Sequence, residues 1–176
     1  MLTQNTLTLA AARQIIFAAE TEAYRLACLC CISVVDMRGQ MIVQARMDGA
    51  LGSRVEESHH TALNALAVGL CLMLHRASGG ALPAGHEAPE GEAHGGEIPV
   101  GWEGDVVGSL KVEAGGITIQ SEGVLRGAIG ISSGSADTDQ AIALAALEAY
   151  RSCQTQDKQA TSAVQPLAGN MFFEFR

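Results

Sequence analysis

The sequence predicts an α+β domain in which helices pack on one antiparallel sheet. Three observations favour this class: two segments with apolar residues at helical spacing, a hairpin signal near residue 36, and short strands after residue 105. The predicted order is helix, hairpin, long helix, Gly-rich loop, three strands and helix. A parallel, doubly wound sheet would contradict this prediction.

The first helix is predicted over residues 9–27. Thr8 suits its N-cap, because the hydroxyl can accept a hydrogen bond from an amide of the first turn. Apolar residues recur behind it at near-helical spacing, with polar residues mostly between them. The apolar positions are Leu9, Ile15, Ile16, Ala19, Ala23 and Leu26. We therefore expect one face of this helix to lie on the sheet.

An antiparallel hairpin is predicted next. An apolar, β-branched run over 32–35 ends at a turn over 36–39, where Asp can bond its own backbone and Gly allows positive φ. Residues 41–43 continue the apolar character in the second strand. That strand delivers Arg46 and Asp48 to a glycine-bearing loop.

The second helix is predicted over residues 54–75. Glu56 and Glu57 suit its positive N-terminal end. Glu56, His60 and Asn64 recur at i, i+4 and i+8, so they share one face. The back half is nearly all apolar and is expected in the core; its apolar residues are Leu63, Leu66, Ala67, Leu70, Cys71 and Leu74.

The segment 77–104 lacks periodicity and is rich in Gly, Pro, Ala and Glu. A long segment of this kind is typical of a mobile surface loop or of a lid over a site. A metal site is a further alternative, because His86 and His94 lie among glutamates. Spacing in a flexible loop fixes no metal geometry, however.

Three strands are predicted after residue 105, over 106–112, 117–120 and 124–132. Gly127 and Gly130 lie in the last of them. Glycine weakens a strand, so such positions often mark the close approach of another backbone or a ligand.

A last helix, capped by Asp137 or Asp139, follows a small-residue loop. The chain then becomes polar and ends in an aromatic segment, 171–175. We expect a single domain over 1–153 and a C-terminal tail over 154–176 that docks on a neighbouring surface, such as another subunit.

Composition narrows the class of protein. A chain of 176 residues fits one domain with a substantial core. The net charge of −8 leaves no basic patch for nucleic acid or for anionic membranes. Five cysteines at irregular spacing predict buried thiols in a reducing compartment rather than disulfides. No signal peptide or apolar run of about 20 residues is present, so we expect a cytoplasmic protein.

Several motifs together resemble the GlcG/HbpS-like family, which includes haem-degrading-like and PduO C-terminal-domain-like proteins. They are VVDMRGQMIVQARMDGA over 34–50, TALNA over 61–65, GGITI over 115–119, GAIGIS over 127–132, and Asp139 with Ala141. The resemblance covers roughly residues 8–152. Two departures stand out: the family's helix lysine is replaced by Thr61, or by His60 if the register slips by one, and its Val-Pro pair becomes Ile117-Thr118.

The resemblance implies an α+β fold with an antiparallel sheet of about five strands, commonly assembled as homo-oligomers. It implies that the protein binds haem, as some members do, or acts on a small catabolic intermediate, as others do. The 48% hydrophobic content also favours self-association. A family name alone does not fix the activity.

Three pieces of the chain are expected to converge on a site: the loop after the hairpin, the start of the second helix, and the Ser-rich loop before the last helix. Each piece also has a purely structural interpretation. An ion pair between Arg46 and Asp48 would only fix the loop, the histidines would be solvated helix residues, and the Ser-rich loop would be only the entry to a helix. The candidate ligand-binding residues are Arg46, Asp48, His59, Ser132 and Ser133, and the candidate catalytic residues are His60, Glu56 and Asn64.

Two hypotheses follow. The first is a protein that binds haem or another small ligand between the hairpin loop and the second helix, with His59 or His60 as the iron ligand. The second is an enzyme of lyase, isomerase or hydrolase type acting on a small organic anion. There His60 would be the acid/base, oriented by Glu56 or Asn64, and Arg46 would hold a carboxylate. The sequence contains no phosphate-loop or Rossmann motif.

Overall fold

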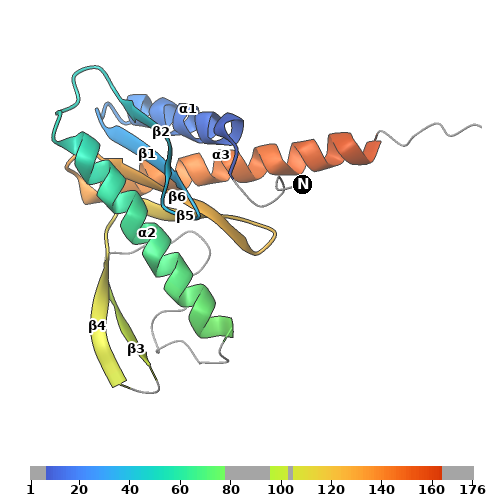
Figure 1. Cartoon of the computed structure of the whole chain (residues 1–176). Helices are drawn as coiled ribbons and strands as arrows, with labels where there is room; N and C mark the ends of the chain where they lie inside the picture. Colours follow the sequence, from blue (N-terminus) through green and yellow to red (C-terminus); the bar gives the residue numbers. More distant parts are fainter. Residues whose placement is uncertain (1–6, 78–95, 103–104, 164–176) are drawn as a thin grey trace, which may run out of the picture.

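The computed structural model describes residues 7–77, 96–102 and 105–163 (Figure 1). The elements in chain order are α1 (Leu9–Arg25), β1 (Cys31–Asp36), β2 (Met41–Arg46), α2 (Arg54–Ala77), β3 (Gly96–Trp102), β4 (Asp105–Val112), β5 (Gly116–Ser121), β6 (Val124–Ser132) and α3 (Ala136–Ala163). The predicted α+β class is confirmed.

The strands form two separate antiparallel sheets. Among the described residues, four strands make one sheet in the order β2-β1-β6-β5, and β3 pairs only with β4. The predicted single sheet of about five strands is therefore a sheet of four plus a hairpin. β3 lies in the segment that we expected to be a loop. The sequence does not indicate this strand, because Gly96, Pro99 and Gly101 interrupt the alternation of apolar and polar residues there. The rest of the Gly-rich segment, with His86 and His94, lies outside the described residues.

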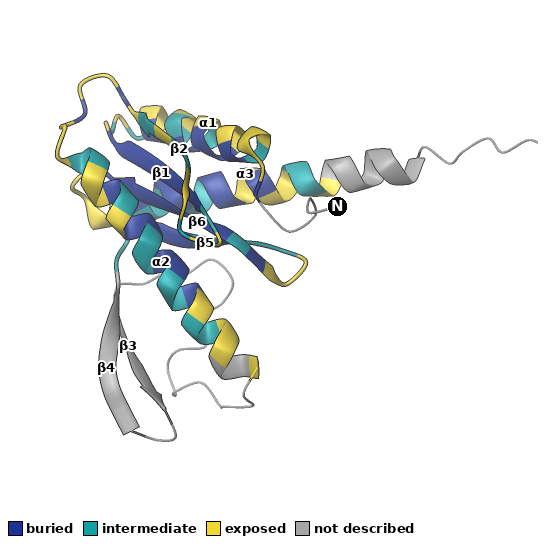
Figure 2. Ribbon diagram, in the orientation of Figure 1, coloured by how far each residue is buried: buried dark blue, intermediate teal, exposed yellow. Residues whose placement is uncertain are grey.

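The four-stranded sheet lies between helices (Figure 1). α2 covers one face, and α1 packs beside α3 on the other. Strand alternation divides the core accordingly: Ile32 and Val34 of β1 belong to the cluster with α1 and α3, and Val35 belongs to the cluster with α2. Figure 2 shows the buried residues gathered in the sheet and on the helix faces that contact it.

α2 lies unusually close to the sheet. A Cβ placed on Gly130 would come 2.2 Å from the backbone oxygen of Ser58, and a Cβ on Gly116 would come 2.9 Å from that of Thr61. The two glycines therefore permit a helix-to-sheet distance that a side chain would prevent, as expected for Gly130 from the sequence.

A chain of polar side chains, buried at Ser33 and Ser58, stabilises the same contact. Gln44 Nε2 donates to Ser33 Oγ at 2.8 Å, and Ser58 Oγ donates to the backbone oxygen of Val55 at 2.9 Å. Ser33 Oγ and Ser58 Oγ lie 2.8 Å apart. Because the Ser58 proton points to Val55, Ser33 is the donor of this pair, and both hydroxyls are satisfied.

The predicted local signals are confirmed at two positions. Thr8 Oγ1 caps α1 by accepting from the amide of Ala11 at 3.2 Å. Asp36 Oδ1 accepts from the amides of Arg38 and Gln40, both at 2.9 Å, and Gly39 has φ 77°. α1 ends two residues earlier than predicted because Ala27 adopts a left-handed φ of 52°.

α3 continues past the predicted domain boundary to Ala163, so residues 154–163 extend the helix. Residues 164–176 lie outside the described part of the chain, and the docking of the tail stays a prediction. In the described segments, no helix has the length and apolar character required to span a membrane.

Candidate functional site

The candidate site lies at the end of the sheet where α2 begins. Cys31, the first residue of β1, pairs with Arg46 of β2 on one side and with Ser132 of β6 on the other. Adjacent strands lie about 4.8 Å apart, so these two predicted residues stand roughly 10 Å from each other across Cys31. The sheet thus brings together the hairpin loop and the Ser-rich loop.

The first turn of α2 joins this site through Glu57. Ser132 Oγ donates to Glu57 Oε2 at 2.9 Å, and Arg54 Nη1 donates to the same oxygen at 2.5 Å. The Ser132 hydroxyl, followed by the Arg54 guanidinium, holds the pKa of the Glu57 carboxyl below its usual value. Glu57 is therefore an anion at neutral pH and connects β6 to α2.

The Ser-rich loop is shaped by Asp139. Its Oδ1 accepts from the amide of Ser133 at 2.9 Å, and the residue is only 7% exposed. Burial raises the pKa of this carboxyl above its usual value, although hydrogen bonds from Ser133 and Gly134 oppose the shift. Asp139 was expected as an alternative helix cap, and it instead fixes the loop that precedes the helix.

Arg54 lies directly over this loop. A Cβ on Gly134 would come 2.7 Å from Arg54 Nη2, at the end of a flexible side chain, and Gly134 has φ 103°, so it is the backbone conformation that favours glycine here. Arg54 Nε is buried and has no hydrogen-bond partner in the described part of the chain. The sequence did not identify Arg54 as a site residue, because no motif around it indicates a contact with a loop about 80 positions away.

Cys31 at the start of β1 and Cys30 just before it are buried, as predicted, whereas the other three cysteines are half-buried. Burial raises the pKa of Cys31, and the nearby Arg46 partly offsets the shift. Burial raises the pKa of Cys30 to about 12. Both cysteines are neutral thiols at physiological pH, so neither is an activated nucleophile.

Arg46 and Asp48 lie on the surface beside the site. Arg46 Nη1 donates to the backbone oxygen of Ala50 at 3.3 Å. Within the described ranges no ion pair joins Arg46 to Asp48, so the guanidinium fixes the loop through a backbone carbonyl. Both side chains are exposed.

The two histidines of α2 differ in their surroundings. The His60 side chain is 66% exposed, and its Nε2 lies 3.8 Å from Glu56 Oε1. The His59 ring is half-buried, and its Nε2 is buried without a partner among the residues described. Asn64, one turn after His60, is also half-buried. No hydrogen bond or ion pair joins His60 to Arg46 in the described part of the chain.

An apolar stripe continues along the helix face that carries His60. We define the outer stripe of α2 as Leu63, Ala67, Leu70 and Leu74, spaced i, i+4, i+7 and i+11. Leu70 is 38% and Leu74 is 69% exposed. Leu63 and Ala67 are half-buried. The back half of α2, expected entirely in the core, thus presents one apolar side to the outside.

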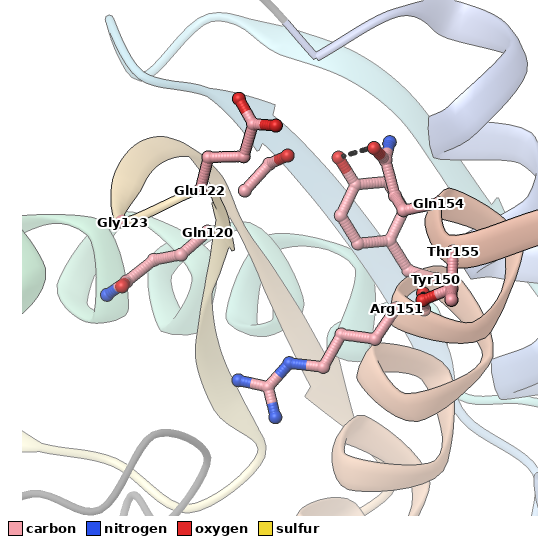
Figure 3. Close-up of a pocket in the computed structure, with 8 residues that line it drawn as sticks. Gln120, Glu122, Gly123, Tyr150, Arg151, Gln154 and Thr155 are labelled. Atoms are coloured by element: carbon pink, nitrogen blue, oxygen red, sulfur yellow. Dashed lines mark hydrogen bonds between the residues drawn. The ribbon is translucent and has the colours of Figure 1, made fainter. Parts of the chain in front are cut away.

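Two hollows lie elsewhere on the molecule. A polar pocket of about 220 Å³ lies between the β5–β6 turn and α3, where Gln154 Nε2 donates to Tyr150 Oη at 3.0 Å (Figure 3). An apolar groove of about 610 Å³ lies between α1 and α3. Neither was predicted, because each combines residues that are distant in the sequence.

A four-stranded antiparallel sheet with one helix on one face and two on the other defines an α+β domain of a recurrent type. The chain belongs to the HbpS-like family: the family model, described as "Haem degrading protein HbpS-like", matches residues 7–148. This confirms the resemblance seen in the motifs.

Solved structures agree with this assignment. Klebsiella pneumoniae protein ORFY has a TM-score of 0.59 and 24% identity, over 86% of this chain and 94% of that one. The PduOC–haem complex has a TM-score of 0.56 and 28% identity, over 82% and 94%. A double mutant of Streptomyces reticuli HbpS has a TM-score of 0.52 and 20% identity, over 84% and 89%. No curated protein matches the chain significantly.

Proposed function

We propose that the protein binds haem on the outer stripe of α2, with His60 as the iron ligand. The observation that carries this proposal is the exposed imidazole of His60 at the head of a stripe of exposed and half-buried apolar residues. An axial nitrogen next to an apolar surface is what a porphyrin requires from a protein. Membership of the HbpS-like family and the likeness to the PduOC–haem complex support the choice of ligand.

The residues of α2 fit this group, and they distinguish the two histidines. Nε2 of His59 is buried, so iron has no access to it without a rearrangement of the helix surface. The His60 ring is 66% exposed. Glu56 Oε1 lies 3.8 Å from Nε2 of His60, so this carboxylate would orient the imidazole through Nε2 and leave Nδ1 for the iron. Haem would supply redox-active iron. The outer stripe of α2 would exclude water from one face of the porphyrin through Leu63, Ala67, Leu70 and Leu74.

Titration with hemin tests the proposal. The wild-type protein should show a shifted Soret band that saturates at a fixed stoichiometry. His60→Ala should change the band position or lower the affinity, and His59→Ala is the matched control that should keep both. Identical spectra and affinities for all three proteins would remove His60 as the ligand.

A second candidate function is favoured by the cations at the head of α2. Arg46 and Arg54 both lie near enough to Cys31 to influence its ionisation, beside the positive end of the helix. Such a place suits a small carboxylate. For an enzyme of this type, His60→Ala should mainly lower kcat and Arg46→Ala should mainly raise KM.

Assembly into a homo-oligomer and a cytoplasmic location stay predictions. Exposed apolar residues on both helical layers, including Phe17 at 71% and Leu74 at 69%, support self-association.

A further inference from the structure

We propose that the apolar groove between α1 and α3 holds the aromatic C-terminal segment of the same chain, residues 171–175. The groove has a volume of about 610 Å³. Its α1 side includes Phe17 and Ala18, and its α3 side is formed by Ala145, Ala149 and Cys153. The last three are spaced i, i+4 and i+8, so they make one continuous strip of small side chains.

The shape and exposure of this groove call for large apolar side chains. Phe17 is 71% exposed at its edge, an unusual position for a phenylalanine. The alanines leave space that a bulky side chain would fill. Aromatic rings bury about 150–250 Å² each and favour contact with other rings at about 4.5–7 Å between centroids.

The composition of the chain points to its own C-terminus as the occupant. The protein has four phenylalanines: Phe17 in the groove, and Phe172, Phe173 and Phe175 in the final five residues. Met171 precedes them and adds a flexible apolar side chain. No other stretch of the sequence concentrates aromatic residues in this way.

The length of the chain permits this contact within one molecule. From Cys153 to Ala163 the ten residues of α3 rise only about 15 Å. The eight residues 164–171 span up to roughly 28 Å when extended. The chain can therefore turn back after α3 and bring residues 172–175 beside Cys153 and Ala149.

The charges are also complementary. Glu22, at one end of the groove, is paired with Arg25 at 2.6 Å. Arg13, at the other end, makes no ion pair within the described ranges. Its positive charge suits Glu174, the single acidic residue among the aromatic ones.

Disulfide trapping with Cys153 provides the test. Phe172→Cys, Phe173→Cys and Phe175→Cys are made separately in the full chain and oxidised mildly, and the linked peptides are identified by mass spectrometry. At least one variant should form a disulfide with Cys153 inside a single chain, and the same variant in a Cys153→Ser background should not. Mixing labelled and unlabelled chains separates links within a chain from links between chains. Links only between chains would overturn the proposal, because the occupant would then be the tail of a second copy.

Proteolysis of the unmodified protein gives an independent readout. Chymotrypsin should cut after Phe172, Phe173 and Phe175 more slowly in the wild type than in Ala149→Glu, which places a charge in the groove. Ala10→Glu, exposed on α1 outside the groove, is the matched control and should keep the protection. Equal cleavage in the wild type and Ala149→Glu, together with the absence of any link to Cys153, would refute the contact.

Discussion

Ser132 Oγ donates to Glu57 Oε2 at 2.9 Å and so joins two residues that are 75 positions apart. This hydrogen bond ties the end of β6 to the first turn of α2, next to the pair that Glu57 makes with Arg54. It places the Ser-rich loop and the start of α2, both expected at the site, in direct contact. The contact is made by Glu57, one position after the predicted Glu56.

Glu57→Gln is predicted to make the stability of the protein less sensitive to acid. The Glu57 pKa is lower in the folded protein than its ordinary value of 4.5, so its contribution is present above pH 4.5 and is lost as the pH falls through the folded pKa. Urea unfolding between pH 6 and pH 3 should give a shallower dependence for Glu57→Gln than for the wild type. Glu56→Gln, changing a side chain that is 86% exposed, is the control and should follow the wild type. Parallel curves for all three proteins would contradict the assignment.

Asp139 is predicted to have the opposite pH dependence. Burial raises its pKa above the ordinary value of 3.8, so the folded state holds the proton more tightly than the unfolded chain. Its contribution is present below pH 3.8 and is lost as the pH rises through the folded pKa. The variant Asp139→Asn removes the cost of a buried charge but keeps an oxygen for the amide of Ser133.

Measuring the unfolding free energy of two variants by urea denaturation separates the role of the hydrogen-bond acceptor from that of the charge. Asp139→Ala should cost about 1–3 kcal/mol of unfolding free energy at pH 7, because the amide of Ser133 loses its acceptor. Asp139→Asn should cost clearly less than Asp139→Ala. Equal losses would show that the negative charge, and not the acceptor, stabilises the loop.

Gly130→Ala should destabilise the packing of α2 on the sheet. The new Cβ would lie 2.2 Å from the backbone oxygen of Ser58 and 2.4 Å from the amide of Ala62, and a backbone cannot rotate away as a side chain can. We expect a loss of about 1–3 kcal/mol, which lowers Tm by about 2–4 °C per kcal/mol for a chain of this size. Gly52→Ala is the control, because the nearest heavy atom to its Cβ would be 4.0 Å away. A melting temperature for Gly130→Ala equal to that of the control would show that α2 has room to move.

Local signals in the sequence predicted the elements well. The turn of the first hairpin could be predicted because Asp36 bonds amides only two and four residues away. β3 could not be predicted, since Pro99 and two glycines remove the alternation that identifies a strand. The number of strands in the sheet could not be predicted either. The residue pattern of β3 and β4 does not indicate whether they join β5 or pair only with each other.

The site was predicted in outline and missed in detail. Arg46 and Ser132 were expected at one place, and the register of β1 brings them to either side of Cys31. Arg54 and its contact with Gly134 were not expected, because contacts between segments far apart in the sequence produce no periodic pattern of residues. His60 was predicted on a polar face, and the exposure of Leu70 and Leu74 below it became visible only in the structure.

The outer stripe of α2 should determine the affinity for hemin without determining the iron ligation. Burying part of two leucine side chains under a porphyrin contributes about 1–3 kcal/mol in total. The double variant Leu70→Ser with Leu74→Ser should therefore weaken hemin binding by about 5- to 150-fold. Because His60 remains, the Soret position of the bound form should not change, in contrast to His60→Ala. The matched control is Leu29→Ser, another exposed leucine, at 47%, which lies before β1 and is not part of the outer stripe of α2. Affinity and spectrum should be measured in the same titration. If the double variant binds hemin as tightly as the Leu29→Ser control, the stripe does not contact the porphyrin, and its exposed leucines are better explained as a surface for association between copies of the chain.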